Sequence, residues 1–254
     1  MNRTIRAIFL LILLFQSGCN PVTEETTGIS TGTNKVAESN LQVGIAYLQR
    51  GEYEKSLEKL TRALDADPSY TPTLNALGLL HQQLGNNDKA EEYFKKALSL
   101  RSNDAYTMNN YGQFLCMNSK YAEAQDMFVK AAKNPLYETP EIAMANAGSC
   151  AMSYNDVEEA EQYFRKALEK NPNIPIALIQ MAEISHDKGD YLAARAFLQR
   201  YLVTEKHTPK SLWLGIRIEE KLGDRDLLSS YALLLRNNFP DSEEAQLLRQ
   251  SGLR

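Results

Sequence analysis

Cysteine and histidine are the residues of this 254-residue chain best suited to chemistry, and the chain has three of each. They are Cys19, Cys116 and Cys150, and His81, His186 and His207. Such residues bind zinc when several stand at fixed short spacings, and they catalyse when a cysteine has a histidine beside it. The two central cysteines have no further ligand at such a spacing, and neither has His186. We therefore expect no metal site.

Catalytic sequence motifs are missing from the chain, which contains no HExxH, no GxSxG and no glycine-rich phosphate loop. Its carboxylates fall in runs such as DKAEEYFKK and DVEEAEQYFRK. Such runs are typical of solvated helix faces on which acidic and basic residues pair four positions apart. We therefore predict a non-enzymatic protein with no cofactor and no small-molecule substrate.

The N-terminus has the pattern of an export signal. Arg3 and Arg6 precede the apolar run 7–15. This run fits a secretory signal and is too short for a membrane-spanning helix, which needs roughly 20 apolar residues. The sequence SGC ending at Cys19 resembles the bacterial lipobox, although Gln16 stands where that pattern usually has leucine. The alternative is a plain secretory signal that leaves Cys19 without a lipid.

The lipobox resemblance implies cleavage after residue 18 and a lipid on Cys19. It also implies delivery to the periplasmic face of the outer membrane, because Asn20 stands where inner-membrane retention signals have aspartate. Residues 19–36 are rich in Thr, Gly and Glu and predict a flexible tether. Cleavage removes two of the 28 basic residues and leaves 26 against 32 acidic ones, a net charge of −6. With no basic patch, we expect no nucleic-acid partner.

Small residues recur along the rest of the chain with a period of 34, interrupted once by an interval of 36. They are Gly44, Gly78, Gly112, Gly148 and Ala182. Sixteen positions after each stands a large apolar residue, in order Leu60, Phe94, Phe128, Phe164 and Leu198. This pattern resembles the tetratricopeptide repeat (TPR), in which two antiparallel helices cross closely at small residues and an aromatic ring fills the remaining space.

The TPR resemblance predicts an all-α solenoid of about six helix-turn-helix repeats wound into a right-handed superhelix. We place the repeats at 37–70, 71–104, 105–140, 141–174, 175–208 and 209–242, followed by a C-terminal capping helix at 243–254. Repeat three is two residues longer than the others, and its tail NPLYETP carries two prolines. We expect this insertion to loosen the turn into repeat four.

TPR arrays bind partners on the concave face that the first helix of each repeat presents, and repeat positions 2, 5, 9 and 12 are expected to line it. We predict a partner-binding groove lined by Leu41, Ile45, Leu48, Asn75, Leu79, Gln82, Asn109 and Gln113. Lysine and arginine are absent from these positions in repeats one to five. A ligand held through its C-terminal carboxylate is therefore not expected.

The first helix of repeat one is apolar on two faces. Val43 and Tyr47 are expected to face its partner helix, and Leu41, Ile45 and Leu48 to form a hydrophobic strip on the other side. An exposed strip of this kind suits an amphipathic helix or an extended segment of a partner. The alternative is that the tether or the array itself covers the strip.

Cys116 and Cys150 fall late in the first helices of repeats three and four. These helices lie side by side in a TPR array, which places the two cysteines within plausible reach of a disulfide, and export puts them in an oxidising compartment. We predict this disulfide. The alternative is that they are two small residues in ordinary helix packing.

The segments NNYGQFLC, YAEAQDMF, NPLYETPE and NAGSCAM resemble repeats three and four of the type IV pilus biogenesis lipoproteins. Members of that family are outer-membrane TPR pilotins, so the resemblance implies an adaptor that binds the pilus secretin subunit and promotes its localisation or multimerisation. The alternative is a TPR lipoprotein scaffold for cell-wall or outer-membrane assembly factors.

Overall fold

A computed structural model describes residues 31–253 of the chain. The predicted signal peptide, Cys19 and the first part of the predicted tether lie outside the described residues. Within 31–253 the chain forms thirteen α-helices and no strand, which confirms the all-α prediction for this part. No helix in this range has the length and apolarity needed to cross a membrane.

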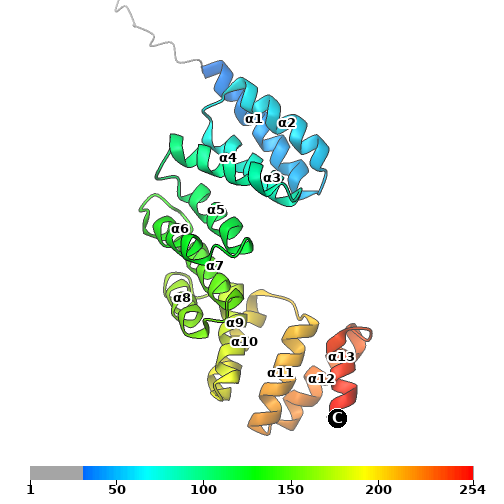
Figure 1. The fold of residues 1–254 in the computed structure, drawn as a ribbon. Coiled ribbons are helices and arrows are strands. Elements are labelled where there is room, and N and C mark those ends of the chain that lie inside the picture. The colour runs from blue at the N-terminus through cyan, green and yellow to red at the C-terminus, as the bar shows by residue number, and fades with distance from the viewer. Residues whose placement is uncertain (1–30, 254) are drawn as a thin grey trace, which may run out of the picture.

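The helices are α1 (Thr31–Gln49), α2 (Tyr53–Ala66), α3 (Thr71–Gln83), α4 (Asn87–Leu100), α5 (Ala105–Met117), α6 (Tyr121–Lys133), α7 (Pro140–Ser153), α8 (Val157–Lys170), α9 (Pro175–Asp187), α10 (Tyr191–Thr204), α11 (Pro209–Leu222), α12 (Arg225–Asn238) and α13 (Glu243–Ser251). The first twelve pack as six pairs that stack in chain order, which is a TPR solenoid (Figure 1). We call the first helix of each pair the A helix and the second the B helix. Each A helix also contacts the A helix of the next pair.

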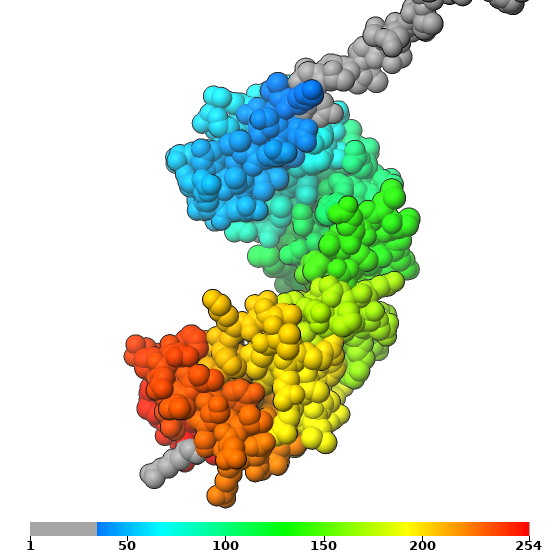
Figure 2. Space-filling model, turned by 180° about the vertical axis from the view of Figure 1, so that it is seen from behind, coloured from blue at the N-terminus to red at the C-terminus, as the bar shows by residue number. Residues whose placement is uncertain are grey.

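The solenoid bends into an arc, and its open side lies between the N-terminal pairs and the C-terminal pairs (Figure 2). The last helix, α13, packs on α11 and α12 and buries Ala245 and Leu248 against them. It therefore covers the apolar face that the sixth pair would otherwise leave open at the end of the array.

Each pair is held together where a small residue of the A helix meets a large residue of the B helix. A Cβ atom built on Gly78 would lie 2.7 Å from Cε1 of Phe94, closer than any real Cβ contact allows. Gly112 and Phe128 repeat this arrangement in the third pair, with 2.8 Å between the same two atoms. The spacing of sixteen residues in the sequence is therefore the register at which the two helices cross.

The turn inside each pair contains one residue in the left-handed region. Four of these residues are the glycines Gly51, Gly85, Gly189 and Gly223. In the other two turns Ser119 has a φ of 61° and Asn155 a φ of 63°. Asparagine tolerates this region better than serine because its side chain can hydrogen-bond locally. Ser119 is therefore the least favourable of the six turn residues.

The first helix begins earlier than predicted. The tether was expected to reach residue 36, whereas α1 starts at Thr31. Adding residues to an existing helix is far easier than nucleating one, and no proline separates Thr31 from Ala37. Ala37, the first residue of the first predicted repeat, is buried.

Candidate partner-binding groove

The concave side of the first three pairs contains a hollow of about 400 Å³. Its apolar floor is formed by Ile45 and Leu48 of α1 and Leu79 of α3, and its walls include Asn75 of α3 and Tyr106 of α5. Four of the eight predicted groove residues therefore meet at one site, namely Ile45, Leu48, Asn75 and Leu79. The hollow lies where A helices of successive pairs come together, so three repeats are needed to build it.

Leu41 was predicted to line the groove, and this prediction was wrong. Its side chain is only 6% exposed, and it belongs to the core cluster that also contains Leu60 and Leu80. Val43 is wrong in the opposite sense, because it was expected to face the partner helix and is instead 40% exposed. In the superhelix, the side of α1 that carries Leu41 packs against α2 and α3. Of the three residues predicted to form the hydrophobic strip, only Ile45 and Leu48 therefore line the groove.

The other predicted groove residues lie outside the hollow. Asn109 is buried in the seam between α5 and α7, where its Oδ1 accepts a hydrogen bond of 2.9 Å from Nδ2 of Asn146. Gln82 is half-buried and its Nε2 donates to Sδ of Met117 at 3.0 Å. Gln113 is exposed. The expected exposure of Asn109 is thus a third error, caused by the closeness of neighbouring A helices.

A row of side-chain amides crosses the seams between three A helices. Nδ2 of Asn110 donates to Oδ1 of Asn75 at 3.1 Å, joining α5 to α3, and the Asn146–Asn109 bond joins α7 to α5. Nδ2 of Asn109 lies 3.5 Å from Oδ1 of Asn110, which links the two bonds into a chain. Asn110 also lines the hollow, although sequence reasoning missed it. The sequence offered one signal for Asn110, since it follows Asn109 directly and holds the same repeat position as Asn146.

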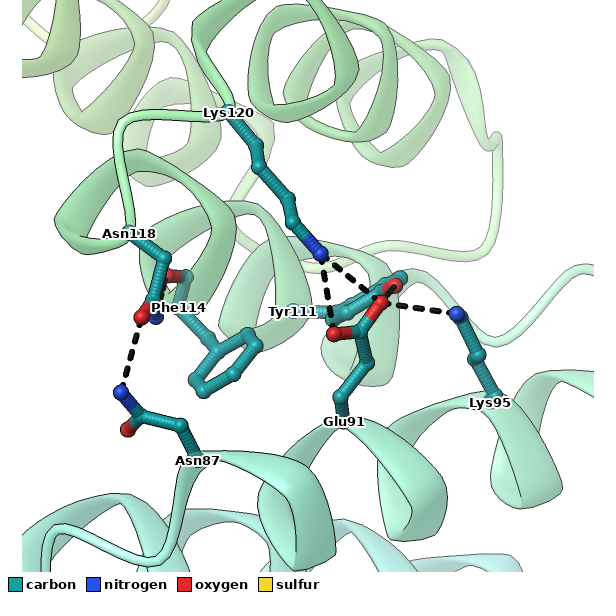
Figure 3. Close-up of polar contacts among 7 residues, drawn as sticks. All are labelled: Asn87, Glu91, Lys95, Tyr111, Phe114, Asn118 and Lys120. Carbon is teal, nitrogen blue, oxygen red and sulfur yellow. Dashed lines mark hydrogen bonds and ion pairs between the residues drawn. The ribbon is translucent and has the colours of Figure 1, made fainter.

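A charged network fastens the second pair to the third (Figure 3). The Glu91 carboxylate of α4 accepts hydrogen bonds from Lys120 at 2.9 Å and from the Tyr111 hydroxyl at 3.2 Å, and pairs with Lys95 at 2.7 Å. The hydrogen bonds from Lys95 and Lys120 lower the pKa of Glu91 to about 2. Burial raises the pKa of the Tyr111 hydroxyl, which therefore stays a donor.

The same seam is also held by an amide pair one helical turn away on α4. Nδ2 of Asn87 donates to Oδ1 of Asn118 at 2.9 Å, and Nδ2 of Asn118 donates to the backbone oxygen of Phe114 at 2.8 Å (Figure 3). Glu91 and Asn87 lie one helical turn apart on α4, so this helix contacts the third pair at two points. The relative position of α3 and α5, on which the shape of the hollow depends, is thereby fixed.

A disulfide joins the third pair to the fourth. Cys116 of α5 and Cys150 of α7 are bonded, with Cα atoms 5.9 Å apart and a sequence separation of 34 residues. This Cα separation lies within the usual range for a disulfide. The link supplements the Asn146–Asn109 hydrogen bond across the same seam.

The concave side of the last two pairs has a different character. The carboxyl of Glu183 on α9 is half-buried, and burial raises its pKa while the charge of Arg217 on α11 opposes that shift. Lys210 also lies near enough to lower the pKa of Glu183. The sixth repeat therefore places two cations, Arg217 and Lys210, at concave positions. The absence of lysine and arginine at these positions holds for repeats one to five but not for the sixth.

The histidines have packing partners. His81 is buried and stacks on Tyr93, with ring centroids 5.4 Å apart. Burial lowers the pKa of His81, which favours the neutral ring. His186 meets Tyr191 edge-on at 5.5 Å, and His207 meets Tyr231 at 6.0 Å. All three rings therefore belong to contacts between aromatic side chains.

The chain is similar to known TPR proteins. Models of the family described as tetratricopeptide repeat match residues 70–135, 117–175 and 151–210, and a model described as TPR repeat matches residues 44–85. The type IV pilus assembly protein PilF of Pseudomonas aeruginosa is 31% identical over 250 residues. That match covers 96% of this chain and 97% of PilF.

Two solved structures resemble the fold along most of its length. The structure of Pseudomonas aeruginosa PilF has a TM-score of 0.79 and 31% identity, and the match covers 87% of this chain and 99% of that one. The crystal structure of PilW, described as a widely conserved type IV pilus biogenesis factor, has a TM-score of 0.75 and 32% identity. This match covers 85% of this chain and 99% of PilW. The similarity therefore extends well beyond single repeats.

Proposed function

This chain belongs to the type IV pilus biogenesis family of TPR proteins that includes PilF, and we propose that it is the adaptor that binds the pilus secretin subunit. In this proposal the protein is a non-enzymatic pilotin. It promotes localisation of the secretin to the outer membrane and its multimerisation there. Its work is binding and delivery, which agrees with a TPR scaffold whose histidines are all engaged in packing contacts.

The observation that carries the proposal is the apolar hollow lined by Ile45, Leu48 and Leu79. Burying an apolar side chain is worth roughly 1.5–3 kcal/mol, so two or three partner side chains in the hollow offset a good part of the cost of association. The Glu91 network and the amide row hold α3 and α5, two of the three A helices that line the hollow, in place before binding. A preformed site of this kind loses little entropy when the partner enters.

The anchor is the second part of the proposal. A lipid on Cys19 holds the protein at the periplasmic face of the outer membrane, and the chain before α1 gives the array its reach. The solenoid then keeps the secretin segment beside the membrane until subunits assemble. A scaffold for cell-wall or outer-membrane assembly factors would use the same hollow and anchor, but membership of a pilus biogenesis family favours the secretin.

Cell fractionation tests this function. A strain lacking the protein is complemented with the native chain or with Cys19→Ala, and the outer membrane is assayed for the adaptor and for secretin multimers. The native chain is expected to restore multimers, while Cys19→Ala is expected in the soluble periplasmic fraction with few multimers. Normal multimers in the strain without the protein would contradict the proposal. Retention of Cys19→Ala in the outer membrane would contradict the anchor alone.

A further inference from the structure

We infer that the groove takes an extended segment of its partner with an acidic side chain held by Arg101, and that this segment continues past the first hollow onto Leu136. The inference rests on the proposed function and specifies the chemistry by which the same site would recognise its partner. It also gives a role to the two-residue insertion in repeat three.

A second hollow of about 360 Å³ adjoins the first. Arg101, Asp104 and Tyr106 line both of them, and the second adds Asn134 and Leu136 from the loop between α6 and α7. Because three residues are shared, the two hollows are neighbouring parts of one surface rather than separate sites. A partner that leaves the first hollow past Tyr106 meets the second.

The inserted loop displays Leu136 in a fixed position. Leu136 is 80% exposed, while the next residue, Tyr137, is buried in a cluster with Ala105 and Ala143. The Leu136 amide donates to Oδ1 of Asn134 at 2.9 Å, and Nδ2 of Asn134 donates to the backbone oxygen of Asn103 at 2.6 Å. An exposed leucine held on both sides can bind a partner with little further loss of freedom.

Tyr106 is the aromatic residue shared by the two hollows. Its side chain is 48% exposed, and it meets Tyr137 edge-on with ring centroids 5.0 Å apart. Its hydroxyl donates to Oε2 of Glu138 at 3.4 Å. The insertion therefore supplies both contacts that orient Tyr106. Aromatic rings held in this way are frequent anchor points at interfaces.

Arg101 is the cation of this surface. It is exposed and belongs to no ion pair among the described residues. The neighbouring carboxylate of Asp104 instead accepts a hydrogen bond of 2.7 Å from the Thr107 hydroxyl. An unpaired arginine that lines both hollows favours a partner carboxylate, because a bidentate pair with carboxylate oxygens is among the strongest polar contacts.

The division of this surface into two adjoining hollows that meet at Tyr106 favours an extended segment over a helix. The hollows hold about 400 and 360 Å³, which suits one or two side chains in each. An extended segment places alternate side chains on one face and leaves its backbone open to the amides of Asn75 and Asn110. The expected pattern is apolar, acidic, apolar.

Peptide binding to the full purified chain tests this inference. Overlapping fluorescent peptides of about 15 residues, which span roughly 50 Å when extended, cover the soluble part of the pilus secretin subunit. Binding is followed by fluorescence polarisation, and the whole subunit is measured in parallel. One region with the apolar, acidic, apolar pattern is expected to bind.

Variants then locate that peptide on the surface. Arg101→Glu is expected to weaken its binding by at least about tenfold, and Leu136→Ser by about threefold to tenfold. Replacing the acidic residue of the peptide by lysine is expected to restore binding to Arg101→Glu. The controls are Arg225→Glu and Leu192→Ser, an exposed cation and an exposed leucine on B helices, which are expected to bind like the native chain.

The outcomes separate this inference from the proposed function. If the native chain binds neither the subunit nor a peptide, both are overturned. If it binds the subunit but no peptide, or a peptide that becomes helical by circular dichroism, recognition of an extended segment is wrong while the proposed function stands. If Arg101→Glu and Leu136→Ser bind the subunit as tightly as the native chain, the assigned surface is wrong and the adaptor function again survives.

Discussion

Arg195 of α10 holds Glu219 of α11 in a buried ion pair that joins the fifth helix pair to the sixth. Nε of Arg195 donates to Oε1 of Glu219 at 3.0 Å, and its Nη2 also contacts the second carboxylate oxygen. The Glu219 side chain is 1% exposed. Asp224 receives a further bond of 3.3 Å from the same guanidinium. The C-terminal end of the array thus depends on a charge that water cannot reach.

Removing only the arginine is expected to be strongly destabilising. Arg195→Met leaves the Glu219 carboxylate buried without its partner and is expected to lower the free energy of unfolding by about 3–5 kcal/mol. The double variant Arg195→Met, Glu219→Met replaces the pair by apolar side chains and is expected to recover most of that loss. Urea unfolding of the three proteins measures both effects. A double variant no more stable than Arg195→Met would contradict the account of an unpaired buried charge.

Replacing Ser119 is expected to stabilise the protein. Ser119 occupies the left-handed region with a φ of 61°, and its hydroxyl accepts only one long hydrogen bond, 3.4 Å from the Tyr121 hydroxyl. Ser119→Gly relieves the backbone strain and is expected to raise the free energy of unfolding by about 0.5–1 kcal/mol. Asn155→Gly is the matched control and is expected to change it by less. Equal gains from both variants would contradict the advantage of asparagine over serine at this turn position.

Acid is expected to weaken the seam between the second and third helix pairs through Glu91. Its pKa of about 2 in the folded protein lies below its ordinary value of 4.5, so the ionised form stabilises the fold above about pH 4.5. This contribution is lost as the pH falls from 4.5 toward 2. After discounting for solvent screening it amounts to about 1–2 kcal/mol at pH 7.

Glu91→Gln makes this contribution measurable. The variant is expected to be less stable than the native chain at pH 7, with a difference that shrinks steadily below pH 4.5. Urea unfolding between pH 7 and pH 2.5 gives the two curves, and Glu92→Gln, at the exposed neighbouring position, is the control for loss of one negative charge. A difference that stays constant across this pH range would show that the network does not depend on the charge of Glu91.

Cys116 and Cys150 are expected to be oxidised in the exported protein. Alkylation of the unfolded chain without reductant is expected to find neither thiol free. In the chain-entropy model a loop of 34 residues is worth about 3–4 kcal/mol, so reduction is expected to lower stability by roughly that amount. The double variant Cys116→Ser, Cys150→Ser is expected to be insensitive to reductant. Two alkylated thiols in the unreduced protein would contradict the disulfide.

The sequence predicts the repeats well because each helix pair repeats the same local constraint. Gly78 must be small for Phe94 to lie against it, and a contact sixteen residues away in the chain recurs with the period of the array. The turn residues can also be predicted from local sequence, because a positive φ favours glycine, as at Gly51 and Gly85. These features depend on one pair of helices at a time.

The groove is harder to predict because it depends on how successive pairs are rotated. Leu41 and Ile45 stand one helical turn apart and look equivalent in the sequence, yet one enters the core and the other lines the hollow. Arg101 and Leu136 lie in connections between pairs and reach the concave surface only through tertiary packing. The repeat pattern of the sequence does not indicate that these two residues lie on the concave surface.

The affinity of the purified full chain for the secretin subunit shows whether the hollow on the first three pairs binds that subunit. Ile45→Ser, Leu48→Ser is expected to weaken binding at least about tenfold, since two apolar contacts of roughly 1.5–3 kcal/mol each are affected. The control Leu192→Ser, Leu233→Ser changes two exposed leucines on the B helices α10 and α12 and is expected to bind normally. Ile45 and Leu48 also pack against the core, so thermal unfolding must first show that the double variant is folded. If the double variant does not fold, the single variant Ile45→Ser is measured in its place. Undiminished affinity in a folded Ile45 variant would contradict the claim.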